Sequence, residues 1–255
     1  MSVTEVLPFY IIIALASYFY GNVNNAVIIS KFLGRDVRKE GSGNPGTLNM
    51  SRTFGIKIGA LVLVLDVLKG VVPALVATLV FGGATFDGTT YGVGECAKYI
   101  AGFFVVFGHV FPVIYKLKGG KGIASTIGFM FVCNWWVALI CGALAIAFIL
   151  LTKLGAIGSF IATVPPIVYN FVNALIVHGK LGGEAFYLFV AAEVCLALNM
   201  ILILYAHRSN IGRLIRGEEN KTDWSGMIKK AFSKKKDTAV AQTGVQSSAE
   251  QTVAT

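Results

Sequence analysis

Long apolar runs separated by short polar loops fill the chain from its first residues to about residue 206. A helix needs about 20 apolar residues to cross roughly 30 Å of hydrocarbon, because each residue adds about 1.5 Å. Six runs have close to that length, and they cover about residues 6–30, 56–81, 96–115, 136–152, 156–177 and 184–206. The pattern therefore predicts an all-α, polytopic integral membrane protein.

The apolar stretch between residues 123 and 152 is too long for one crossing and too short for two. Trp135 and Trp136 lie near its middle, and tryptophan prefers the interface between membrane and water. We predict a short re-entrant or packed helix over about residues 123–133, followed by the spanning helix that begins at about residue 136. The chain then has about seven transmembrane or re-entrant helices.

Composition supports this fold class and narrows the partners. Hydrophobic residues make up 55% of the chain and charged residues 14%, and the mean hydropathy is +0.71. The net charge of +9 favours anionic lipid and anionic substrates, because the spans exclude a soluble nucleic-acid binder. The four cysteines sit singly in apolar segments, so we expect no metal site and no disulfide framework.

Lysine and arginine collect in the loops at 31–57 and 116–121 and after residue 206, whereas the loop at 82–95 has none. Because cytoplasmic loops carry the excess of basic residues, we predict an outside N-terminus and a cytoplasmic C-terminus. Residues 1–219 then form the membrane-embedded domain. Residues 220–255 are predicted to be a basic, largely disordered cytoplasmic tail that lies against the anionic inner leaflet.

The first polar loop, residues 41–52, reads GSGNPGTLNMSR. Its glycines match G-x-G-x-x-G, but no strand precedes them, so we reject a dinucleotide-binding motif. The Ser42 hydroxyl, the side-chain amides of Asn44 and Asn49 and the Arg52 guanidinium are groups that bind phosphates or hydroxyls. A plain interhelical turn is the alternative interpretation.

The second polar loop lies within residues 108–125, which read GHVFPVIYKLKGGKGIAS. Glycines let backbone N–H groups approach a ligand, and lysines supply compact positive charge, so this loop suits a phosphate. It does not fit the nucleotide-binding pattern G-x-x-x-x-G-K-[ST].

The third polar cluster follows the last apolar run, and on a helix His207, Asn210 and Arg213 share one face. His207 is a candidate phosphate ligand or base, and a basic helix end that reaches for water is the alternative. Inside the second span, Asp66 and Lys69 lie one helical turn apart. An unpaired charge there is costly, so we expect them to pair with each other, with contact to substrate as the alternative.

Together the three clusters, in this order, resemble the bacterial membrane glycerol-3-phosphate acyltransferases that use acyl phosphate, the PlsY family. The resemblance covers roughly residues 5–219. Leu48 departs from it, because the family usually has threonine there, whereas Ser125 keeps the hydroxyl of the usual threonine.

The resemblance implies transfer of a fatty acyl group from acyl phosphate to the 1-hydroxyl of glycerol 3-phosphate, the first step of phospholipid synthesis. The products are lysophosphatidic acid and phosphate. Acyl phosphate is already activated, so we expect no metal, no cofactor and no serine triad, with catalysis by positioning and by cationic stabilisation. The general base is either His207 or a phosphate oxygen of the substrate. A membrane carrier of organic phosphates is the alternative function.

The catalytic candidates are Ser42, Arg52, Lys121, His207 and Asn210. The substrate-binding candidates are Gly41, Gly43, Asn44, Asn49, His109, Lys118, Gly119, Gly120, Gly122, Ser125 and Arg213. We expect a multi-pass monomer in the bacterial inner membrane. Its partners are the two phosphorylated substrates and membrane lipid, and its active site faces the cytoplasm.

Overall fold

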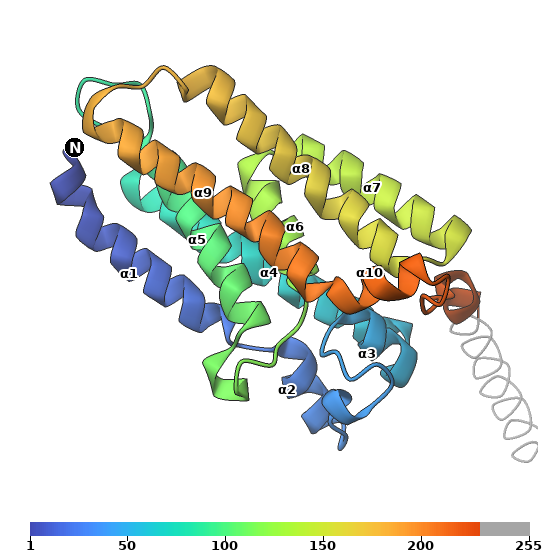
Figure 1. Ribbon diagram of the computed structural model, residues 1–255. Helices are drawn as coiled ribbons and strands as arrows, with labels where there is room; N and C mark the ends of the chain where they lie inside the picture. The colour runs from blue at the N-terminus through green and yellow to red at the C-terminus, as the bar shows by residue number, and fades with distance from the viewer. Residues whose placement is uncertain (230–255) are drawn as a thin grey trace, which may run out of the picture.

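The computed structural model describes residues 1–229, and over these residues the chain is a bundle of long helices (Figure 1). An isolated bridge between Thr85 and Gly92 is the one β-type pairing there. The helices are α1 (Val3–Gly21), α2 (Asn25–Phe32), α3 (Thr47–Phe54), α4 (Ile56–Phe81), α5 (Val93–Val110), α6 (Ile123–Cys133), α7 (Trp135–Thr152), α8 (Gly155–His178), α9 (Gly183–Ala206) and α10 (Arg208–Ile215). The predicted all-α architecture is confirmed.

Six helical stretches within residues 1–229 are long and apolar enough to cross a membrane, and they correspond to the six predicted runs. The 11-residue α6 begins and ends where the short helix was predicted. Asn134 separates α6 from α7, because its extended backbone, with φ −157° and ψ 86°, cannot continue a helix. The two tryptophans then open α7 with their side chains exposed.

The first apolar run differs from the prediction, because it forms two helices instead of one. The side-chain amide of Asn22 donates to the Tyr18 carbonyl over 2.6 Å. Two residues later, the Asn24 carboxamide oxygen caps α2 by accepting from the Val27 backbone N–H over 3.0 Å. Asparagine side chains compete in this way with the helical backbone bonds, so the chain turns at this point.

Helix α5 lies at the centre of the bundle, where it packs against α1, α4 and α9. Its contact with α1 depends on two glycines, Gly21 and Gly108, whose Cα atoms face each other across the helix crossing. A Cβ on Gly108 would collide with the Tyr18 carbonyl, so a larger residue would force the helices apart. This close packing fixes the end of α5 from which the second polar loop departs.

The outer faces of the long helices keep large apolar side chains exposed, including Ile12, Leu79 and Leu151 at 62%, 66% and 84%. Such surfaces suit lipid hydrocarbon, in agreement with a membrane-spanning bundle. The short helices α2, α3 and α10 gather at the end of the bundle opposite the N-terminus (Figure 1). The polar clusters of the sequence therefore meet at one end of the molecule.

Candidate active site

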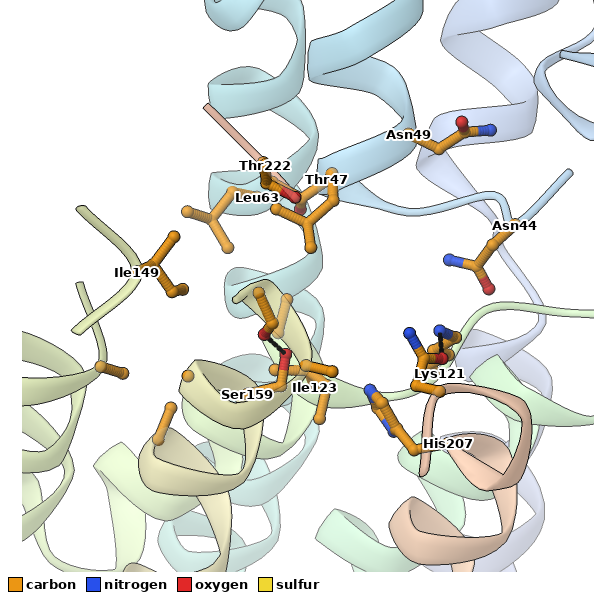
Figure 2. Close-up of a pocket in the computed structure, with 18 of the residues that line it drawn as sticks. Asn44, Thr47, Asn49, Leu63, Lys121, Ile123, Ile149, Ser159, His207 and Thr222 are labelled. Carbon is orange, nitrogen blue, oxygen red and sulfur yellow. Dashed lines mark hydrogen bonds between the residues drawn. The ribbon is translucent and has the colours of Figure 1, made fainter. Parts of the chain in front are cut away.

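A cavity of about 290 Å³ opens where α3, α6 and α10 begin, and residues of all three polar clusters line it. Figure 2 shows Asn44, Lys121 and His207 on one side of this cavity and Ile149 on the other. Loops that lie far apart in the sequence thus supply one site.

The first cluster is held by Asn49, which is buried in the first turn of α3. Its side-chain N–H group donates to the Glu40 carbonyl over 2.9 Å, and its oxygen accepts from the Ser42 backbone N–H over 3.1 Å. Gly41 has a φ of +53°, which lets the chain turn so that Ser42 reaches the cavity rim. Asn49 therefore shapes the loop, although it also lines the cavity.

The second cluster folds back onto the end of α5. The backbone N–H groups of Gly119 and Gly120 each donate over 3.1 Å to carbonyls of the last turn of α5, those of Val110 and His109. A Cβ on Gly120 would collide with the His109 imidazole, so only glycine permits this approach. The loop thereby directs Lys121 into the cavity, where its ammonium donates to the side-chain oxygen of Asn210.

Burial lowers the pKa of Lys121 to about 8, although the Glu219 carboxylate works against this effect. The side chain is therefore mainly charged at neutral pH. Burial also lowers the pKa of the Arg52 guanidinium, again opposed by Glu219, but an arginine stays protonated in proteins. Arg52 and Lys121 form no ion pair with a carboxylate within residues 1–229, so the cavity holds positive charge for an anion.

The third cluster begins at the junction of α9 and α10. His207 places its Nδ1 atom 3.0 Å from the Ile203 carbonyl oxygen, so Nδ1 carries the proton and Nε2 has a free lone pair. Burial and, to a smaller extent, the nearby positive charge of Lys121 lower the pKa of His207 to about 4. The imidazole is therefore neutral at physiological pH, and its Nε2 atom is a hydrogen-bond acceptor for a substrate hydroxyl.

Glu219 joins the parts of the third cluster, and sequence reasoning did not select it. Its carboxylate accepts from the Asn210 side-chain N–H over 2.6 Å and from the Arg213 Nε–H over 3.0 Å. Because Asn210 also accepts from Lys121, the four residues form one chain of hydrogen bonds. Glu219 follows a turn at Gly217, so its contact with α10 depends on a chain reversal that spacing alone does not reveal.

A buried polar network supports the cavity from inside the bundle. The predicted pairing of Asp66 with Lys69 is confirmed, with 3.5 Å between Oδ1 and Nζ. Asn25 donates to the same carboxylate over 2.8 Å, and the Lys69 Nζ atom lies 2.8 Å from His109 Nδ1. The Lys69 ammonium also donates over 2.7 Å to the Val23 carbonyl, at the break between α1 and α2. Both Asp66 and His109 line the cavity.

Four helices, α3, α6, α8 and α10, begin at the cavity, and none of them has a side-chain cap. The first residues of α3 and α6 line it, as do His207 and Asn210 at the start of α10. The backbone N–H groups of a first helical turn have no partner within the helix and carry partial positive charge. The arrangement therefore favours an anionic ligand such as a phosphate.

The other half of the cavity is apolar. Side chains of α4, α6, α7 and α8 form it, among them Leu63, Ile127, Ile146, Ile149 and Ala162. The cavity is thus amphiphilic, with cations and helix N-termini at one side and a hydrocarbon surface at the other. A ligand that joins a phosphate to an aliphatic chain matches both sides.

The structure brings most of the predicted site residues together. The ones that line the cavity are Ser42, Asn44, Asn49, Arg52, His109, Lys121, Gly122, His207, Asn210 and Arg213. Gly43, Lys118 and Gly119 line an adjoining cavity of about 870 Å³ that has a strongly basic wall. Gly41 and Gly120 shape the loops. Ser125 lies outside both linings, because α6 turns it toward α4, where its backbone packs against Gly70.

Several lining residues were not among the predicted site residues, namely Thr47, Asp66, Ser159, Glu219, Asn220, Thr222 and Trp224. Three of these belong to residues 220–255, which were predicted to be a tail. The structure places Asn220, Thr222 and Trp224 against the bundle, and residues 230–255 lie outside the part that it describes. Over residues 1–229, no cluster of three or more His, Cys, Asp or Glu side chains is arranged to hold a metal.

Fold and cavity together define a polytopic membrane protein with an amphiphilic, cationic site at one end of its helical bundle. Residues 11–217 match the family model described as glycerol-3-phosphate acyltransferase. The chain therefore belongs to the glycerol-3-phosphate acyltransferase family.

Relatives that carry this family's name align with this chain over nearly their whole length. The glycerol-3-phosphate acyltransferase of Mycoplasma mobile is 33% identical, over 90% of this chain and 99% of the relative. The glycerol-3-phosphate acyltransferase of Clostridioides difficile is 35% identical, over 83% of this chain and 95% of the relative. The crystal structure of PlsY (YgiH), an integral membrane glycerol 3-phosphate acyltransferase in its glycerol 3-phosphate form, is similar with a TM-score of 0.63 at 30% identity. The structural similarity covers 83% of this chain and 94% of the PlsY chain.

Proposed function

We propose that this protein transfers a fatty acyl group from acyl phosphate to the 1-hydroxyl of glycerol 3-phosphate. The products are lysophosphatidic acid and inorganic phosphate. The observation that carries the proposal is the amphiphilic cavity, which has the cations Arg52 and Lys121 on one side and an apolar wall on the other. The cations suit a phosphate, and the apolar wall suits an acyl chain. The related solved structures, described as the glycerol 3-phosphate and lysophosphatidic acid forms of PlsY, support the acceptor and the product.

In the proposed reaction, the hydroxyl oxygen of glycerol 3-phosphate attacks the acyl carbon. A new ester bond forms, the bond between that carbon and the phosphate oxygen breaks, and phosphate leaves with the bonding electrons. Lys121 and Arg52 stabilise the charge that develops on the leaving phosphate, because fixed cations in a partly buried site interact strongly with it. The same contacts hold both phosphorylated substrates in a reactive orientation.

The hydroxyl proton has two acceptors in this arrangement. One is the free Nε2 atom of the neutral His207, and the other is a phosphate oxygen of a substrate. Neither route requires a serine nucleophile, because acyl phosphate already carries a good leaving group. Ser42 and Asn44, at the cavity rim, are placed to bind phosphate or glycerol hydroxyls.

The predicted topology places this chemistry at the cytoplasmic face of the bacterial inner membrane. The second, basic cavity shares Ser42, Asn44, Lys121 and Arg213 with the first. It offers a water-soluble anion a route to the site that avoids the apolar wall, since clustered positive charge attracts anions. The acyl donor then occupies the apolar side, which is bounded by spanning helices.

A direct test uses protein purified in detergent, palmitoyl phosphate and glycerol 3-phosphate, with a chelator present. We expect equal amounts of lysophosphatidic acid and phosphate to form, with no product when palmitoyl-CoA replaces palmitoyl phosphate. Activity with acyl-CoA alone would refute the proposed donor. Uptake of glycerol 3-phosphate into liposomes without acyl transfer would indicate a carrier instead.

A further inference from the structure

The chain after α10 lines the cavity with Glu219, Asn220, Thr222 and Trp224. Gly217, with a φ of +71°, reverses its direction, and the Glu218 backbone N–H donates over 2.8 Å to the Arg213 carbonyl. We call residues 218–224 the C-terminal strap. The family model ends at residue 217, directly before the strap.

Three contacts hold the strap against the bundle. Arg52 of α3 donates from Nη2 to the hydroxyl oxygen of Thr222, which is completely buried. The Thr222 backbone N–H donates over 2.7 Å to the carbonyl of Lys153, in the turn between α7 and α8. The Lys153 ammonium also lies 3.0 Å from the Asp223 carboxylate. The strap therefore connects α3 to the α7–α8 turn across the cavity.

The strap is also part of the cavity wall. Thr222 and Trp224 line the same cavity as Arg52 and Ile149. A Cβ on Gly155, at the start of α8, would lie 2.7 Å from Leu48 Cδ1 and 3.5 Å from Thr222 Oγ1, so α3, α8 and the strap meet there. The indole Nε1 atom of Trp224 is buried and has no hydrogen-bond partner within residues 1–229.

We propose that the C-terminal strap is a wall of the acyl-donor binding site, with Trp224 as a specificity-determining residue and Thr222 as a positioning residue for Arg52. This inference rests on the proposed function. Trp224 lines the cavity with a large rigid surface, which an aliphatic chain in the proposed donor site would contact. Thr222 occupies one of the five N–H donors of Arg52, which fixes the guanidinium plane and leaves the other donors for phosphate.

The test compares Trp224→Ala, Thr222→Val and Thr222→Ser with the wild type, using lauroyl, palmitoyl and stearoyl phosphates. Trp224→Ala should change the ratio of kcat/KM between lauroyl and stearoyl phosphate by about tenfold, because apolar pockets discriminate between chain lengths on this scale. The same variant should leave KM for glycerol 3-phosphate within about twofold of the wild type. Thr222→Val should lower kcat/KM by about tenfold for every donor, whereas Thr222→Ser should retain it because the hydroxyl remains.

The matched control is Ile228→Ala, which alters an exposed side chain of the same terminal segment. Variants of Trp224 and Thr222 that match this control in both kinetic readouts would overturn the inference while leaving the acyltransferase proposal intact. A loss of folding is recognised by a lower melting temperature and a polydisperse detergent complex. A wild type that cannot use any acyl phosphate would instead refute the proposed function.

A binding measurement keeps the inference testable if the Trp224 variants fold poorly. The chain has three tryptophans, and replacing Trp135 and Trp136 by phenylalanine leaves Trp224 as the only indole. Lauroyl phosphate should shift the fluorescence emission of this variant, because the acyl chain contacts the ring, whereas glycerol 3-phosphate alone should not. An emission spectrum that no acyl phosphate changes would contradict the placement of Trp224 at the donor site.

Discussion

Removing the Lys121 ammonium is the sharpest test of the cationic site. Within residues 1–229, Arg52 and Lys121 are the cavity cations without a carboxylate partner, because Arg213 already pairs with Glu219. In the proposed reaction, Lys121→Ala therefore removes one of the two charges assigned to the leaving phosphate. Losing one preorganised donor to a developing charge costs about 2.7–4 kcal/mol, which corresponds to a decrease of at least ~100-fold in kcat/KM.

The assay is phosphate release from palmitoyl phosphate that depends on glycerol 3-phosphate, with protein checked for monodispersity. Lys118→Ala is the control, because Lys118 belongs to the same loop but lines only the adjoining basic cavity. It should change kcat/KM much less than Lys121→Ala. Gly120→Ala should also lose activity, because its Cβ would collide with the His109 ring and displace the loop. A normal kcat/KM for Lys121→Ala would refute the phosphate-binding role.

Three further predictions follow from burial and charge. First, kcat/KM should fall as pH rises through about 8, where Lys121 loses its proton. Lys121→Arg should remove this alkaline limb while retaining activity, and an unchanged limb would assign it to another group. On the acid side, the His207 pKa of about 4 means that activity should persist below pH 6.5, where an ordinary histidine becomes charged. Second, Lys69→Met should lower the free energy of unfolding by about 3–5 kcal/mol, because it leaves the buried Asp66 carboxylate unpaired. The double variant with Asp66→Asn should lose less, and equal losses in denaturant titrations would contradict a mutual pairing. Third, cysteines placed in the loop at 82–92 should react with an impermeant maleimide on intact cells, whereas those at 116–121 should react only after the membrane is opened. The reverse labelling pattern would refute the predicted orientation.

The sequence by itself determined the fold class and the three polar clusters. Apolar runs of about 20 residues have few alternatives to membrane helices, because unsatisfied backbone groups are too costly in hydrocarbon. The paired tryptophans located the short helix at about residues 123–133, and α6 spans Ile123–Cys133. The motif residues were found because glycines, lysines and a histidine are chemically conspicuous among apolar neighbours.

Only the tertiary structure decided how these residues are used. Asn49 is occupied in holding its own loop, and Ser125 faces α4 because the phase of α6 turns it there. Glu219 and Thr222 enter the site through a chain reversal after α10, and their partners Asn210 and Arg52 lie 9 and 170 residues away in the sequence. Such contacts depend on where helices cross and loops return, and these positions are set by packing across the whole bundle, which no local pattern records.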